Sequence, residues 1–231
     1  MPSILQRLRG QLIVSCQPVP GGPMDRPEIV AAFAQAAMDG GAAGLRIEGI
    51  ANVLAVRRVT SAPLIGLIKR DLPDSPVHIT PCVQDVHDLA AAGADIIAFD
   101  ATDRVRPEPL WSLVSAVRSL GCIAMADCAS ARDGRVAHDL GVEILGSTMS
   151  GYTGGEVPTG PDLALVAELA RVGRFVVAEG RYHTPAQASD AMAAGASAVV
   201  AGSAITRTEH VTSWFVRAIG AERSADRVLV V

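Results

Sequence analysis

Four short apolar segments of this chain each end in one ionisable residue. Lys69 follows the letters L-I-G-L-I, Glu179 follows F-V-V-A, and Asp100 and Asp127 end two further segments of the same kind. Partial burial lowers the pKa of a lysine and raises that of a glutamate, so such groups can exchange protons near neutral pH. Lys69 and Glu179 are therefore candidate proton-transfer residues. The alternative is that they form an ion pair whose role is structural.

Glycine-containing turns follow two apolar segments in the last quarter of the chain. Gly180 comes directly after Glu179, and Gly202-Ser203 comes after the segment 197–201. Glycine lets backbone N–H groups approach an anion, the Ser203 hydroxyl adds a donor, and Arg207 can supply positive charge. These turns predict a phosphate site, although two ordinary turns would look the same. With the candidate proton-transfer pair, they indicate chemistry on a phosphorylated small molecule.

Other polar residues at segment ends are candidates for ligand contacts. Gln17 and Arg46 can each hydrogen-bond a polar ligand, and the alternative is that they form a structural polar layer that caps the barrel. Asp127 could hold a sugar hydroxyl or orient Lys69. Asp100 is expected to cap its own loop, with Asp103 and Arg104 paired at the surface. The histidines and cysteines show neither HExxH nor CxxC spacing, so a zinc site is unsupported. Acidic residues at strand ends could bind magnesium, but we expect no metal site.

The elements that must position these residues alternate regularly along the chain. Gly-capped helix ends followed by short apolar segments are typical of βα units joined in a parallel sheet. Eight such units favour a closed barrel over an open doubly wound sheet, and we expect one α/β domain over residues 1–231, a (β/α)8 TIM barrel. The predicted strands are 11–16, 43–47, 64–68, 95–99, 122–126, 143–147, 175–178 and 197–201. The predicted helices are 27–39, 49–58, 82–92, 108–119, 130–140, 161–172, 184–194 and 208–219.

Composition excludes several classes of protein. The net charge of −4 and the lack of a basic tract argue against binding to nucleic acid or to an acidic membrane surface. No apolar stretch approaches the length of a membrane span, and the first residues do not have the pattern of a signal peptide. We therefore expect a cytoplasmic protein with reduced cysteines. The oligomeric state stays open, and a homodimer is compatible with the sequence.

In its motifs the chain resembles the N-acylmannosamine-6-phosphate 2-epimerase family, enzymes of sialic acid breakdown. The resemblance runs in order through nearly the whole chain. It rests on L-I-V-S-C-Q (12–17), G-L-R (44–46), L-I-K-R-D (67–71), I-T-P (79–81), G-A-D-I-I-A-F-D-A-T (93–102), M-A-D (125–127), S-G-Y-T (150–153), A-E-G-R (178–181) and G-S-A-I-T-R (202–207).

This resemblance implies a TIM barrel of the ribulose-phosphate-binding type that needs no cofactor. It implies an epimerase that interconverts N-acetylmannosamine-6-phosphate and N-acetylglucosamine-6-phosphate at C2, with Lys69 and Glu179 as the proton-transfer residues. The residues implied to contact the sugar are Gln17, Arg46, Asp127 and Tyr152, and those implied to hold the phosphate are Gly180, Gly202, Ser203 and Arg207. The chain departs from the usual family pattern at Leu72, at Ile47-Glu48 and at Cys128-Ala129, which bears on the preferred acyl group.

Two other functions agree with the same residues. One is a phosphate-binding barrel aldolase or isomerase in which Lys69 forms a Schiff base. The other is a protein that binds a phosphosugar without catalysis. Trapping with borohydride would distinguish the first, and binding without turnover the second.

Overall fold

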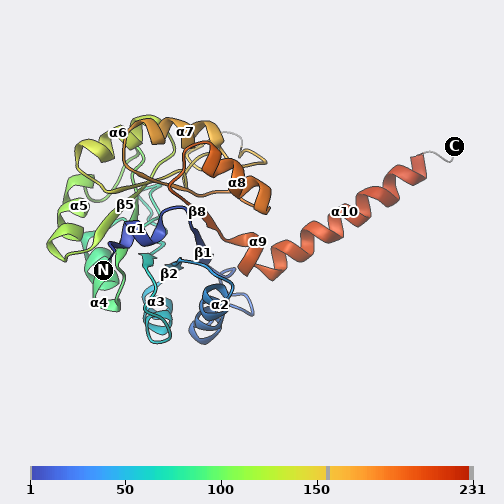
Figure 1. The fold of residues 1–231 in the computed structure, drawn as a ribbon, viewed down its shortest axis with the longest axis horizontal. Helices are drawn as coiled ribbons and strands as arrows, with labels where there is room; N and C mark the ends of the chain where they lie inside the picture. The colour runs from blue at the N-terminus through green and yellow to red at the C-terminus, as the bar shows by residue number, and fades with distance from the viewer. Residues whose placement is uncertain (1, 155–156, 229–231) are drawn as a thin grey trace.

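Eight parallel strands pair in chain order, from β1 to β8 and back to β1, and close into a barrel (Figure 1). The structure is a computed structural model and describes residues 2–154 and 157–228. The predicted (β/α)8 barrel is confirmed, and each predicted strand boundary lies within one residue of the observed one. The strands are β1 (Leu12–Cys16), β2 (Gly44–Glu48), β3 (Leu64–Leu67), β4 (Ile96–Asp100), β5 (Ile123–Asp127), β6 (Ile144–Gly146), β7 (Phe175–Ala178) and β8 (Ala198–Ala201).

Seven helices that connect successive strands surround the barrel, and local signals account for their ends. Proline occupies the first turn of α2 and of α8, where its missing N–H costs no hydrogen bond. The Ser130 and Thr184 hydroxyls cap α6 and α8, and Gly93 ends α4 in the left-handed conformation that a glycine adopts without strain. The helices are α2 (Pro27–Asp39), α3 (Ile50–Arg57), α4 (Val83–Ala92), α5 (Leu110–Ser119), α6 (Ala131–Asp139), α7 (Leu163–Arg171) and α8 (Pro185–Ala193).

The strands separate two apolar cores. One core fills the barrel interior and includes Ile65 and Leu67 of β3 and Phe175 and Val177 of β7, all buried. The other lies between the strands and the surrounding helices. Because successive strand residues point to opposite faces, a residue two positions beyond Leu67 or Val177 continues the inward-facing row. This alternation directs Lys69 and Glu179 toward the barrel axis.

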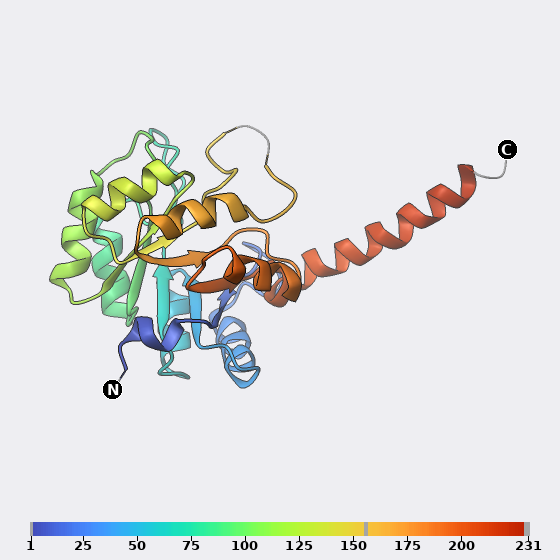
Figure 2. The ribbon, with the colours of Figure 1, turned by 45° about the horizontal axis from the view of Figure 1, so that its top comes forward.

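A short helix with no counterpart among the predicted helices closes the amino end of the barrel. This helix, α1 (Ile4–Leu8), lies below the strands in Figure 2, and Leu8 is completely buried in the interior core. A capping box between Ser3 and Gln6 stabilises its first turn. A Cβ on Gly44 would lie 2.7 Å from Leu8 Cδ2, so this approach needs glycine at the start of β2. One helical turn is too short to produce a periodic pattern.

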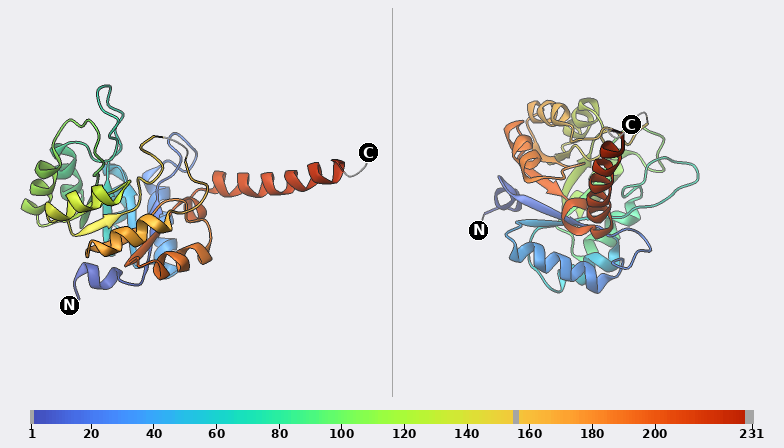
Figure 3. Two further views of the ribbon diagram at one scale, coloured as in Figure 1. Left: turned by 90° about the horizontal axis from the view of Figure 1, so that it is seen from above. Right: turned by 90° about the vertical axis from the view of Figure 1, so that its right-hand side faces the viewer.

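The chain after β8 departs from the expected pattern. A further short helix, α9 (Ser203–Thr206), follows the barrel, and α10 (Thr208–Val228) then extends well beyond the predicted end at residue 219. Figures 1 and 3 show α10 projecting away from the barrel rather than packing beside α8. The assignment of residues 1–231 to one domain stays a prediction. Among the residues described, no helix combines the length and the apolar character needed to cross a membrane.

Candidate active site

A cavity of about 180 Å³ lies at the carboxyl end of the barrel, where the ends of parallel strands meet. It is formed by residues at or after the ends of β1, β3, β6, β7 and β8. Eight of the ten predicted site residues line it: Gln17, Lys69, Tyr152, Glu179, Gly180, Gly202, Ser203 and Arg207. The structure therefore brings the candidate proton-transfer pair and the candidate phosphate residues together around one space.

The other two predicted residues, Arg46 and Asp127, are buried and do not line the cavity. Arg46 Nη2 donates to Asp127 Oδ2 at 2.6 Å, and Arg46 Nη1 donates to Glu179 Oε1. Burial alone lowers the pKa of Arg46, but its two carboxylate partners outweigh that effect and raise it. The guanidinium is thus a buried cation that holds two carboxylates in place.

Asp127 is the most deeply buried acid of this cluster. Burial raises its pKa to about 7, and the negative charge of Glu179 acts in the same direction. The Arg46 guanidinium opposes the shift, as does a 2.6 Å hydrogen bond that Asp127 accepts from the Thr148 hydroxyl. Arg46 supplies a charged donor to one Asp127 carboxylate oxygen, and Thr148 supplies a neutral donor to the other. Because both donors stabilise a carboxylate, we take Asp127 to be ionised.

Glu179 is held through both its side chain and its backbone. Besides the ion pair with Arg46, its Oε2 lies 3.5 Å from Thr148 Oγ1. The Ser147 hydroxyl accepts from the Glu179 N–H at 3.0 Å and donates to its carbonyl at 2.8 Å. Ser147 and Thr148 were not predicted as site residues. The available signal was their place at the end of the sixth predicted strand, 143–147.

The Lys69 ammonium has no hydrogen-bond or ion-pair partner within the described part of the chain, and its side chain is exposed in the cavity. Loss of water contacts lowers its pKa, and the positive charges of Arg46 and Arg207 add to that effect. The negative charges of Glu48 and Glu179 oppose it. The structural Lys69–Glu179 ion pair that the sequence allowed is not formed, because Arg46 binds the Glu179 carboxylate instead.

The lysine content of the sequence also singles out Lys69. Of the 20 lysine and arginine residues in the sequence, 19 are arginines, and Lys69 is the only lysine. An arginine stays protonated at any physiological pH, whereas a lysine with a lowered pKa can titrate. The chain therefore carries its one titratable side-chain amine in the cavity.

The candidate phosphate residues come together around α9. Gly180 has a φ of +110°, which a side chain would strain, and Gly202 directly precedes the first residue of α9, Ser203. Arg207 Nε donates to the Gln17 carbonyl at 2.7 Å, which ties the end of α9 to the loop after β1. A Cβ on Gly202 would lie 3.2 Å from Ser15 Cβ, closer than most such contacts. Small residues here keep the backbone N–H groups within reach of the cavity.

Comparison with known proteins identifies the family. A sequence model of the family described as "Putative N-acetylmannosamine-6-phosphate epimerase" matches residues 30–221. The chain belongs to this epimerase family. A relative from Pasteurella multocida, named "Putative N-acetylmannosamine-6-phosphate 2-epimerase", is 59% identical over 94% of this chain and 96% of its own length. A relative of the same name from Glaesserella parasuis is 58% identical over 94% of each chain.

Solved structures agree with this assignment. The N-acetylmannosamine-6-phosphate 2-epimerase from Clostridium perfringens superposes with a TM-score of 0.91 at 37% identity, over 94% of this chain and 96% of that one. The deoxyribose phosphate aldolase from Aeropyrum pernix, at 18% identity and a TM-score of 0.64 over 92% of this chain and all of that one, shares the fold alone. The suspected family and the predicted enzyme class, an epimerase, are thus confirmed.

In this member of the epimerase family, the cavity rim includes residues that the sequence analysis did not select. Arg181 donates to the carbonyls of Gly160 at 2.7 Å and Ser150 at 2.8 Å, and its guanidinium lies 5.6 Å from the centre of the Tyr152 ring. His183 also lines the cavity. Arg181 thereby holds the long loop after β6 that carries Tyr152, which is 52% exposed. Its position directly after the E-G pair was the signal available.

The described residues contain no group of three or more His, Cys, Asp or Glu side chains arranged to hold a metal ion. Of the two acidic site residues, Glu179 pairs with Arg46, and Asp127 binds Arg46 and the Thr148 hydroxyl. The cavity is lined by the Lys69 amine, the Glu179 carboxylate and the candidate phosphate residues.

Proposed function

We propose that this protein interconverts N-acetylmannosamine-6-phosphate and N-acetylglucosamine-6-phosphate by removing and returning the proton at C2. The observation that carries the proposal is that the Lys69 ammonium, which has no partner among the described residues, shares a cavity with Glu179, whose carboxylate pairs with Arg46 and whose backbone is held by the Ser147 hydroxyl. Membership of the epimerase family supports the same substrate pair.

The reaction needs an acidic C–H bond, and the open-chain form of the sugar supplies one. In that form the C1 aldehyde lies next to C2, so loss of the C2 proton gives a planar enediolate-like intermediate. Return of a proton to the opposite face inverts the centre. Lys69 follows β3 and Glu179 follows β7, four strands apart in an eight-stranded barrel, so they approach the cavity from opposite sides. Proton transfer by such positioned groups contributes about 10²–10⁴-fold to rate.

The remaining residues divide into two roles in this proposal. Arg46 and Asp127 keep Glu179 in position, with Arg46 supplying positive charge near the developing negative charge of the intermediate. Gln17 and Tyr152 contact the sugar. The phosphate binds where the loops after β7 and β8 meet, to Gly180, Gly202, Ser203 and Arg207, as is common in barrels of this type.

Proton NMR of N-acetylmannosamine-6-phosphate with the enzyme in deuterated water tests the reaction. We expect N-acetylglucosamine-6-phosphate to form, with deuterium incorporated at C2. Substrate cleavage with inactivation by borohydride would instead indicate Schiff-base chemistry at Lys69. Binding without product or deuterium exchange would leave only a binding function. Unphosphorylated N-acetylmannosamine should react with a far lower kcat/KM, and equal use of it would contradict the phosphate assignment.

We also propose that the protein is cytoplasmic. A separate proposal is that two copies of the protein associate through α10. Phe215, Val216 and Ile219 of this projecting helix are 57–67% exposed. A second hollow, lined by Leu12, Met192 and other residues of β1, α8 and β8, lies where the eighth helix of a barrel would pack. In this proposal the apolar face of α10 from a second copy packs into that hollow.

Light scattering after gel filtration tests this association. We expect Ile219→Asp to lower the measured mass to that of one chain. Trp111→Asp, a matched change at another exposed apolar residue on α5, should leave the mass unchanged. A single-chain mass for the parent protein would refute the association.

A further inference from the structure

Glu48 has no part in the proton transfer proposed for Lys69 and Glu179. It ends β2, next to β3 in the barrel, opposite Leu67. Its Oε1 accepts a hydrogen bond from the Lys69 backbone N–H at 3.3 Å. The Asn52 side chain donates to the Glu48 carbonyl at 2.9 Å, and the Gly49 N–H donates to the Leu67 carbonyl at 2.9 Å. The Glu48 side chain thus continues the contact between β2 and β3 past the last regular pair, up to Lys69.

The charge of Glu48 is also distinctive among the groups that face Lys69. Arg46 on β2 and Arg207 after α9 are positive, while Glu48 on β2 and Glu179 after β7 are negative. Glu179 is already paired with Arg46. Glu48 makes no ion pair within the described part of the chain, so its negative charge is not offset by a guanidinium in direct contact. An unpaired carboxylate near an amine favours the protonated amine.

We propose that Glu48 is a positioning residue for Lys69: its carboxylate holds the end of β3 through the Lys69 backbone N–H and adds a negative charge to the surroundings of the amine. This inference rests on the proposed role of Lys69 in proton transfer. Glu48 does not touch the substrate in this account. It acts only through the place and the protonation state of Lys69.

The single lysine makes a direct measurement possible. In protein labelled with ¹³C-lysine, the one side-chain Cε resonance reports the titration of Lys69 without any assay of activity. Glu48→Gln removes the charge but keeps an oxygen that can accept the Lys69 N–H. We expect it to lower the pKa of Lys69 by about half a unit or more. Glu48→Asp keeps the charge but shortens the reach, so it should leave that pKa closer to the parent value and lower kcat several-fold, because misplacement of a reacting group is costly.

Glu143 offers a matched control. It lies just before β6, at the amino end of the barrel, and its carboxylate likewise accepts a backbone N–H of a neighbouring strand, that of Ala124 at 3.1 Å. Glu143→Gln should leave the Lys69 titration and kcat unchanged.

The kinetic readout is the pH profile of kcat/KM. We expect the limb that belongs to Lys69 to move to lower pH in Glu48→Gln by the same amount as the NMR titration. An unshifted Lys69 resonance in Glu48→Gln, relative to Glu143→Gln, would overturn the proposal. A shifted resonance with an unshifted pH profile would support the effect of Glu48 on Lys69 and would instead contradict the catalytic role of Lys69.

Discussion

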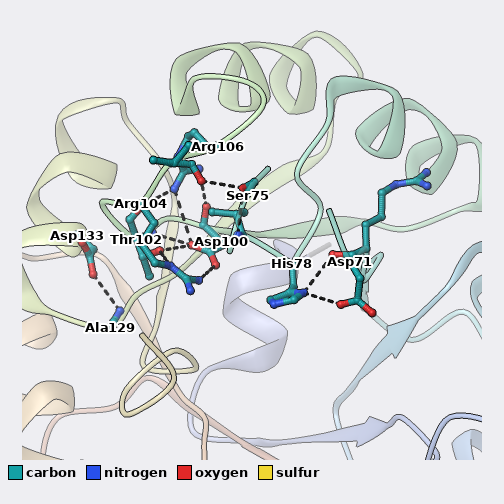
Figure 4. A network of polar contacts seen from close by, with 12 residues as sticks. Asp71, Ser75, His78, Asp100, Thr102, Arg104, Arg106, Ala129 and Asp133 are labelled. Carbon is teal, nitrogen blue, oxygen red and sulfur yellow. Dashed lines mark hydrogen bonds and ion pairs between the residues drawn. The ribbon is translucent and has the colours of Figure 1, made fainter. Parts of the chain in front are cut away.

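Lys69 and Asp100 each lie at the end of a buried strand, at the same end of the barrel, yet the two charged groups differ in their partners and in their exposure. Asp100 is completely buried and accepts hydrogen bonds from the Thr102 N–H at 2.9 Å, the Thr102 hydroxyl at 2.6 Å and Arg104 Nη2 at 2.5 Å. Arg106 adds an ion pair at 3.8 Å (Figure 4). The Lys69 ammonium has no such partner within the part of the chain described here, and it is exposed in a cavity.

This difference separates a structural charge from a functional one. Both carboxylate oxygens of Asp100 are occupied, so it has little capacity left for a ligand. No described residue takes up any of the three donors of the Lys69 ammonium, and this ammonium loses part of its hydration, which leaves it available for a substrate. A charge at a strand end is therefore a weak sign of function. A charge at a strand end that the protein leaves unpaired beside a cavity is a much stronger one.

Removing the Lys69 amine should have the largest effect. Lys69→Met keeps much of the apolar stem, so we expect a normally folded protein whose turnover falls by about 10²–10⁴-fold or more. NMR assay of epimerisation, with circular dichroism to check folding, measures this. Activity within tenfold of the parent protein would place Lys69 in the same structural class as Asp100.

Glu179→Gln tests whether the second group moves a proton or only supplies charge. The amide cannot carry the proton, so epimerisation should fall sharply, while C2 exchange with solvent deuterium persists from the one epimer whose C2 proton faces Lys69. Comparing exchange from each purified epimer measures this asymmetry. Near-normal epimerisation in both directions would leave Lys69 acting without Glu179.

Asp100→Asn should instead lower stability. Arg104 and Arg106 would lose the charge that they pair with, and breaking a largely buried ion pair of this kind costs about 3 kcal/mol of unfolding free energy. Urea unfolding measures the change, and C2 exchange in the folded variant should stay within about tenfold of the parent. Asp103→Asn, which removes an exposed pair with Arg132, serves as the control and should cost less than about 1 kcal/mol. Equal costs would contradict the structural role of Asp100.

Chelation should have the smallest effect. Because proton transfer by Lys69 and Glu179 needs no Lewis acid, we expect EDTA to leave the initial rate unchanged. Loss of activity with EDTA and its recovery with a divalent ion would indicate Asp100 and Asp127 as metal ligands. The contrast between Lys69 and Asp100 would then no longer separate a functional charge from a structural one.

The local pairing around Asp100 illustrates how far sequence reasoning reaches. The expectation that Asp100 caps its own loop is confirmed by its bond to the Thr102 N–H. The expectation that Asp103 pairs with Arg104 is wrong: Arg104 turns inward to Asp100, and Asp103 pairs with Arg132 at 3.2 Å. The buried carboxylate attracts the guanidinium more strongly than an exposed one does, because water screens the surface pair. Residues 100–104 by themselves do not show that Asp100 is buried, and this burial decides which acid Arg104 pairs with.

The sequence by itself determined the barrel, the order of its strands and the inward direction of Lys69 and Glu179. These features depend on alternation within a strand and on glycine at helix ends, which are local patterns. Only the tertiary structure decided that Arg46 binds Glu179, 133 positions away, and that Asp127 lies behind the cavity rather than on its wall. The tertiary structure alone also shows that α1 closes the amino end of the barrel and that α10 projects away from the barrel. Such arrangements depend on register, cavity shape and competition among charges from different strands, and no single stretch of sequence contains that information.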